Sequence, residues 1–244
     1  ERFYRTYYAP NNATLVIAGD LDEAETLGLI QKHYGKIPRA RIPRFVPSSE
    51  PPQRSERSLE LQRPTPAPKL ALAYRAPSFR DRDYPALALA SEILFGGRSS
   101  RLFARMVRDE EIATDLHGSL APFADAGLYE IWVSLRPGRE LPEALKLLDQ
   151  ELARLCKRGV TQAELQKVKN RMELGFLQGM ETAAGKAEQL GFFEIVHGDA
   201  AALFERLETL RAVQPADVQR VAQRYFDAKR RTRIAVLPQA GAAA

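Results

Sequence analysis

The spacing of hydrophobic positions changes several times along this chain, and each spacing predicts an element. Apolar residues that alternate with polar ones, or form short apolar runs, predict strands at residues 14–18, 58–62, 69–75, 112–120, 127–135 and 232–237. Apolar residues at helical spacing predict helices at residues 1–8, 22–35, 81–95, 99–111, 141–158, 161–181, 183–197, 200–210 and 215–226. The chain therefore combines long helices with a smaller number of short strands.

The strand predicted at 127–135 has one face that is entirely apolar. Tyr129, Ile131 and Val133 alternate with Glu130 and other residues of mixed polarity, so the apolar side is expected to be core. A short loop joins it to the strand at 112–120, which predicts an antiparallel hairpin. Two strands, two helices, a hairpin, further helices and a closing strand predict an α+β fold, with an antiparallel sheet that has helices packed on one face.

Proline divides the chain. Residues 38–52 contain Pro38, Pro43, Pro47, Pro51 and Pro52, a density that prevents helix and favours an extended tether. We therefore expect three parts. Residues 1–37 are a helix–strand–helix remnant of a similar first domain, too small to bury a core. Residues 38–54 are a linker, and residues 55–244 are the second domain, whose last five residues are expected to fray.

Four local signals predict turns and helix ends. Gly96-Gly97 allows a tight corner between two helices, and Ser99 is expected to cap the second of them. Asp22 is expected to cap the helix that Gly35 ends, with Leu27, Leu29 and Ile30 on its inner face. Thr161 and Glu164 have the spacing of a capping box.

Three segments in order resemble one enzyme family. In chain order they are Phe3 to Asp22 (FYRTYYAPNNATLVIAGDLD), Phe95 to Ala113 (FGGRSSRLFARMVRDEEIA) and Gly159 to Met172 (GVTQAELQKVKNRM). Together they are similar to landmarks of the insulinase/pitrilysin-type zinc metallopeptidases, which include the mitochondrial processing peptidase. The segment at Phe3 resembles the end of that family's first, catalytic half, and the segment at Phe95 resembles a landmark of its second, non-catalytic half. The resemblance implies a domain that closes over the catalytic half and encloses a peptide.

The zinc motif of that family is absent from the chain. The family uses His-x-x-Glu-His with a more distant Glu, whereas His33, His117 and His197 have no histidine partner four residues away. We expect no metal site in this sequence, and zinc in the missing first half if the full-length protein is active. The chain starts at Glu1 inside an expected helix, without an initiator methionine, so we expect a fragment of a longer polypeptide.

Composition and charge exclude or disfavour several other classes of protein and site. A single cysteine, Cys156, excludes an internal disulfide framework and a thiolate cluster. The net charge of +5 is mild, and the arginine clusters at 39–63 and 229–233 lack interleaved aromatic residues, so a solvated surface is favoured over nucleic-acid binding. No uncharged apolar run is long enough to predict a membrane span. No feature of the sequence specifies a compartment, and bacterial periplasm and cytoplasm both stay open.

The resemblance also implies two substrate-binding positions and no catalytic residue. In the family an Arg after the Gly-Gly corner and a Tyr at the start of the next strand contact the substrate carbonyl or oxyanion. Arg108 matches the Arg, and the Tyr position falls on Asp115, or on Thr114 if the loop is one residue shorter. Two alternatives stay open. In the first, Arg108 only forms a salt bridge at the end of its helix and does not contact the substrate. In the second, the full-length protein lacks zinc ligands and acts as the structural partner of an active peptidase chain. The edge of the strand at 112–120 can also pair with an extended peptide.

Overall fold

A computed structural model describes residues 1–44 and 50–239. Contacts divide the chain into two compact units. One comprises Glu1–Pro51 and Gly175–Phe204, and the other comprises Pro52–Leu174 and Glu205–Ala244. The second unit contains the sheet and the main hydrophobic core, so it is the unit that positions the candidate site.

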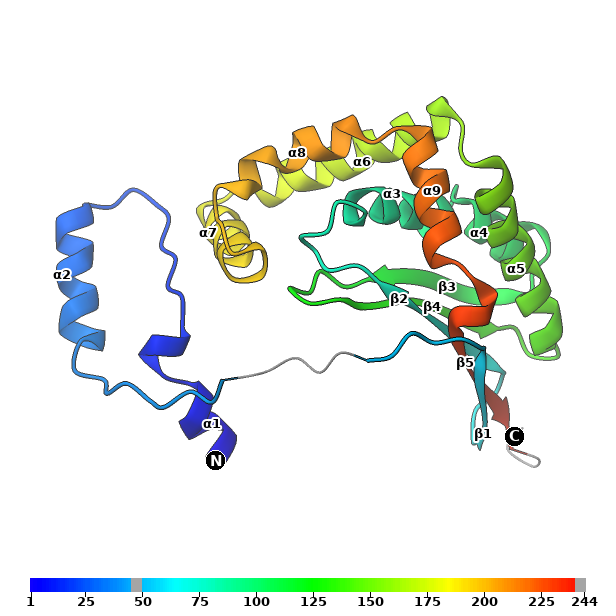
Figure 1. The fold of residues 1–244 in the computed structure, drawn as a ribbon, viewed down its shortest axis with the longest axis horizontal. Coiled ribbons are helices and arrows are strands. Elements are labelled where there is room, and N and C mark those ends of the chain that lie inside the picture. The colour runs from blue at the N-terminus through cyan, green and yellow to red at the C-terminus, as the bar shows by residue number, and fades with distance from the viewer. Residues whose placement is uncertain (45–49, 240–244) are drawn as a thin grey trace. The chain divides into compact units, whose positions relative to one another are not determined.

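The second unit is built on a five-stranded sheet with the order β1-β5-β2-β4-β3 (Figure 1). The strands are β1 (Arg57–Arg63), β2 (Lys69–Ala76), β3 (Ala113–Leu120), β4 (Gly127–Leu135) and β5 (Arg231–Pro238). β3 and β4 form the predicted antiparallel hairpin, and β2 pairs antiparallel with both β4 and β5. The closing strand β5 enters between the first two strands and runs parallel to β1. The α+β class is confirmed, with one parallel pair in an otherwise antiparallel sheet.

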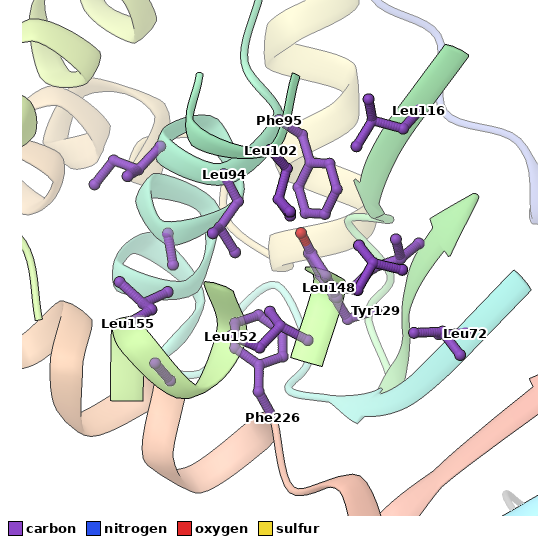
Figure 2. Packing of buried hydrophobic residues seen from close by; sticks show 14 of the residues in the cluster. Leu72, Leu94, Phe95, Leu102, Leu116, Tyr129, Leu148, Leu152, Leu155 and Phe226 are labelled. Atoms are coloured by element: carbon purple, nitrogen blue, oxygen red, sulfur yellow. The ribbon is translucent and has the colours of Figure 1, made fainter. Parts of the chain in front are cut away.

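Helices cover one face of this sheet. The helices nearest the core are α3 (Tyr84–Phe95), α4 (Arg101–Phe103), α5 (Leu141–Arg158) and α9 (Pro215–Tyr225). Figure 2 shows Leu94 of α3, Leu148 and Leu152 of α5 and Phe226 after α9 packed with Tyr129 of the sheet. Burial of such side chains contributes about 1.5–3 kcal/mol each, so this layer holds the unit together.

The remaining helices are α1 (Arg2–Tyr7), α2 (Glu23–Tyr34), α6 (Gln162–Gly179), α7 (Ala183–Phe192) and α8 (Ala202–Ala212). Two predicted helices change from α-helical to π-helical geometry before they end. The helix expected at 99–111 is the single turn α4 followed by a π-helical segment, Ala104–Asp109, and α7 continues as a π-helical segment, Phe193–His197. Gly198 adopts a left-handed φ of 83° and ends the latter.

The first fifty residues differ from the prediction. The run at 14–18 is not a strand, because no other strand in the described residues pairs with it and a strand needs a neighbour for its backbone hydrogen bonds. Leu27 and Leu29 of α2 are exposed rather than facing a core. Asp22 caps α2 as predicted, since its Oδ1 accepts from the Glu25 amide at 2.8 Å.

Caps elsewhere are partly as predicted. The Thr161–Glu164 capping box is present, with the Glu164 amide donating to Thr161 Oγ1 at 3.2 Å and the Thr161 amide donating to Glu164 Oε2 at 2.9 Å. The prediction that Ser99 caps the helix after the Gly-Gly corner is wrong. Ser100 occupies the cap position, and the Ser99 hydroxyl instead accepts from Lys167 Nζ.

The linker prediction falls partly outside the described residues. Residues 38–44 and 50–54 contain neither helix nor strand, whereas 45–49, and the tail at 240–244 that was expected to fray, lie outside what the structure describes. The proposed domain boundaries at residues 37 and 54 stay predictions.

Candidate functional site

The face of the sheet opposite the helices carries a row of side chains that crosses every strand. The strand register aligns His117 of β3 with Trp132 of β4, then Ala71 of β2, Ile234 of β5 and Leu59 of β1. Trp132 is 45% exposed and Leu59 is 51% exposed. The row is defined here as the open-face row. Alternation along β2 and β4 explains its central part, because the neighbouring side chains of these two strands point into the core.

Charged side chains lie on the same face on both sides of this row. Lys69 and Arg75 flank Ala71 along β2, and Glu130 precedes Trp132 by two residues on β4. Trp132 Nε1 donates to Glu130 Oε2 at 3.4 Å, which orients the indole along the face. A surface that combines an aromatic ring, aliphatic side chains and both signs of charge suits contact with a polypeptide.

β3 is an edge strand of the sheet. It pairs with β4 on one side and with no strand on the other within the described residues. The register shifts between Ala113 and Asp115, so Thr114 is the extra residue of a β-bulge. The Thr114 hydroxyl donates to the Ser134 carbonyl at 3.2 Å and is exposed. Because of the bulge, Thr114 departs from the regular alternation of side chains at the start of this edge strand.

Arg108, the other predicted position, lies in the last turn of the π-helical segment. Its guanidinium forms a fork with Asp109, with Nε–Oδ1 at 2.7 Å and Nη2–Oδ2 at 3.2 Å, and its side chain is 62% exposed. The hydrogen bond to Asp109 raises the pKa of Arg108, and the same bond lowers the pKa of Asp109. No hydrogen bond or ion pair joins Arg108 to Thr114 in residues 1–44 and 50–239.

The two preceding arginines of this helix, Arg101 and Arg105, form ion pairs within the fold. Arg101 donates to Glu164 at 2.9 Å and to the nearly buried Glu151 at 3.3 Å. The hydrogen bond from Arg101 is the main reason that the pKa of Glu164 falls to about 2. Arg105 pairs with Glu110 at 2.9 Å. Only its tertiary partners reveal that Arg101 anchors this helix to α5 and α6.

The histidines are scattered rather than grouped. His33 lies in the last turn of α2, His117 on the open-face row and His197 at the end of its π-helical segment. Among the described residues no three His, Cys, Asp or Glu side chains are placed to hold a metal ion. Cys156 is a free thiol, and burial raises its pKa, which disfavours a thiolate nucleophile.

No described helix is both long and apolar enough to span a bilayer. Sequence reasoning missed most of the open-face row. It separated the apolar side of β4 from the side that carries Glu130, but the strand order that extends the row to Ile234 and Leu59 depends on the position of β5.

Comparisons with known proteins agree with this architecture. The family model described as "Peptidase M16 inactive domain" matches residues 1–172. The zinc protease PqqE of Helicobacter pylori is 24% identical over 242 residues, which cover 98% of this chain and 54% of that protein. The mitochondrial-processing peptidase subunit beta of Lentinula edodes is 22% identical over 92% of this chain and 50% of its own length. The crystal structure of a protease from Helicobacter pylori has the same fold, with a TM-score of 0.89 at 24% identity over 97% of this chain and 58% of that one. The chain spans about half the length of the curated relatives it matches.

Proposed function

This chain belongs to the peptidase M16 inactive-domain family, and from that membership we propose that it is the zinc-free, substrate-enclosing half of a zinc-dependent endopeptidase. The metal would lie on a catalytic half outside this sequence, on the same polypeptide or on a homologous partner chain. Residues 1–37 would be the end of that catalytic-type domain, residues 38–54 the linker, and residues 55–244 the domain that covers the peptide.

The open-face row is the observation that supports this role most directly. A sheet buried on one face only normally shows polar residues to water, yet this face presents Trp132, Ile234 and Leu59 in register. Among the described residues no group of three His, Cys, Asp or Glu side chains is placed to hold a metal ion. Aromatic and aliphatic side chains exposed in register support binding of a polypeptide.

The edge of β3 supplies a second mode of contact. An extended peptide can add to an edge strand through backbone hydrogen bonds, whatever its sequence, which suits an enzyme that accepts unfolded segments. We propose that Arg108 and Thr114 contact the peptide near the start of this edge. Arg108 would turn its exposed guanidinium from Asp109 toward a peptide carbonyl, and Thr114 would donate its hydroxyl to the same group.

Trp132 allows a direct test, because it is the only tryptophan in the chain. Titration of the chain with an unfolded peptide should shift the tryptophan emission to shorter wavelength as the ring loses water contact. Leu59→Asp should weaken the binding, because it places a charge in the open-face row. The matched control is Leu174→Asp on α6, which charges an equally exposed leucine (57% against 51%) outside the sheet. Unchanged emission, or equal weakening by both variants, would contradict the proposal.

The proposal also requires that the chain alone hydrolyses nothing. The purified chain, incubated with a fluorogenic peptide with and without a chelator, should give no cleavage in either condition. Cleavage that the chelator abolishes would place a catalytic metal on this sequence and overturn the division of roles.

A second candidate function is a structural partner of an active peptidase chain, with no zinc ligands anywhere in the full-length protein. The specific observation is at the family's tyrosine position, where Thr114 directs its hydroxyl to the neighbouring Ser134 carbonyl and Asp115 would repel an oxyanion. The sequence that precedes Glu1 discriminates between the two functions. A His-x-x-Glu-His motif there rejects this alternative, and its absence supports it.

A further inference from the structure

The Gly-Gly corner between α3 and α4 borders a solvent-facing cavity of about 280 Å³. Its wall comes from the end of α3, the corner itself and the first half of α6. Among its lining residues are Arg98, Ser99, Ser100, Lys167 and Arg171. The cavity lies wholly within the second unit, and its lining shares no residue with the open-face row.

Ser99 and Ser100 both line this cavity. Ser100 is only 5% exposed, and its Oγ has no hydrogen-bond partner among the described residues. A buried hydroxyl without a partner costs about 1–3 kcal/mol, so each such group calls for an explanation. Ser99 lies beside it and accepts a hydrogen bond from Lys167 Nζ at 2.6 Å. Lys167, Ser99 and Ser100 all line the same cavity.

Positive charge exceeds negative charge around this wall. Within residues 1–44 and 50–239, Arg98 has no carboxylate partner, and the single contact of Lys167 is the neutral hydroxyl of Ser99. The lining also holds two acids. Glu164 is paired with Arg101, and Glu92 Oε2 lies 3.5 Å from Nη1 of Arg171 but has no hydrogen-bond partner among the described residues. Two cations are thus left facing the cavity without a counter-charge.

The corner holds this arrangement in a fixed shape. Gly97 adopts a φ of 82°, and a Cβ built there would lie 2.8 Å from Nη1 of Arg171. The missing side chain lets the guanidinium of Arg171 lie against the backbone of the corner, where it also faces Glu92. Glycine at position 97 thus suits both the positive φ of the corner and the approach of Arg171.

We propose that this cavity binds a phosphate group, either as the inorganic ion or as a phosphomonoester. A phosphate offers oxygens to Lys167 and Arg98 together with an acceptor for the orphaned hydroxyl of Ser100, and hydrogen bonds between charged partners are the stronger ones. The volume equals that of several water molecules at about 30 Å³ each, which leaves room for a group esterified to the phosphate. The site is independent of the proposed peptide-binding face.

The test is isothermal titration of the full chain with inorganic phosphate and with a nucleoside monophosphate, at constant ionic strength set by chloride. Lys167→Gln and Ser100→Ala should each raise the phosphate Kd about tenfold or more, because each removes a hydrogen bond to a charged group. Lys146→Gln is the matched control, since it removes an exposed lysine of α5 outside the cavity. It should leave the Kd unchanged, and circular dichroism should verify that all three variants fold.

The two ligands identify the source of the phosphate. Binding of inorganic phosphate alone assigns the site to the free ion, whereas binding of both assigns it to phosphomonoesters, and either result supports the proposal. Absence of binding, equal affinity for succinate, or the same Kd in the wild-type chain and in Lys167→Gln would overturn it.

Discussion

We expect the carboxylate of Asp83, just before α3, to be a main connection between α3 and α9. Its side chain is completely buried. It accepts hydrogen bonds from Arg220 at 2.7 Å, Arg224 at 2.8 Å and Tyr225 at 3.1 Å, all on α9. Burial alone would raise the pKa of Asp83, but these hydrogen bonds and the two guanidinium charges outweigh it and hold the pKa below its ordinary value.

We predict that Asp83→Asn destabilises the second unit by about 3 kcal/mol. Loss of one hydrogen bond to a charged group costs about 1.5–3 kcal/mol, and Asp83 has two such bonds with arginine. The side chains of Arg220 and Arg224 are 45% and 57% exposed, so water can solvate them once the carboxylate is gone. The cost therefore falls at the lower end of the range of about 3–5 kcal/mol for breaking a buried pair.

Urea denaturation followed by circular dichroism measures this difference. With a urea dependence of about 1–3 kcal/mol per molar, the midpoint should fall by about 1 M or more. Asp125→Asn in an exposed loop removes the same charge at the surface and should change the stability by less than about 0.5 kcal/mol. A loss below 1 kcal/mol for Asp83→Asn, or equal losses for both variants, would refute the reasoning.

The pH dependence of the same network has a definite sign. Because the folded pKa of Asp83 is lowered, its contribution is fully present above the unfolded value of about 3.9 and is lost as the pH falls through the folded pKa. In Asp83→Asn, the fall in stability below about pH 4 should be smaller than in the wild-type chain.

Three further predictions concern the corner, the capping box and the core. Gly97→Ala should cost about 1–3 kcal/mol in urea denaturation, because alanine is strained at a φ of 82° and its Cβ meets Arg171. Thr161→Ala should cost about 1 kcal/mol and, by removing a hydrogen bond to Glu164, raise the pKa of that carboxyl from about 2 in an NMR titration. Leu148→Ala should cost about 2–5 kcal/mol, since Leu148 is fully buried. An unchanged midpoint or pKa would count against the corresponding contact.

Local patterns were sufficient for most elements of the second unit. The strand predicted at 127–135 is observed as β4, and the helix predicted at 141–158 is observed as α5, both without change. Both succeed because a single period runs through the whole element, with the apolar face of β4 buried and Leu128 and Trp132 exposed. The run at 14–18 failed for a different reason. An apolar segment becomes a strand only where another backbone pairs with it, and within the described residues none does.

The candidate site was less accessible to sequence reasoning. Arg108 and Thr114 came from the resemblance to a family rather than from a pattern, and their contact with a substrate stays a prediction. Asp83 gave no signal, because its partners lie more than 130 residues away along the chain. Sequence reasoning missed most of the open-face row for the same reason, since its members belong to strands whose neighbours are set by the sheet topology.

The sequence by itself determined where most helices and strands of the second unit occur, which side of β4 is buried, which family the ordered landmarks resemble and that the zinc motif is missing. Tertiary structure decided that β5 enters beside β1, that Arg101 is drawn inward, and that one face of the sheet presents Trp132, Ile234 and Leu59 together. The division has a physical cause. Periodicity and capping act within a few residues of the chain, whereas strand order, buried ion pairs and surfaces arise from contacts between segments that only the folded chain brings together.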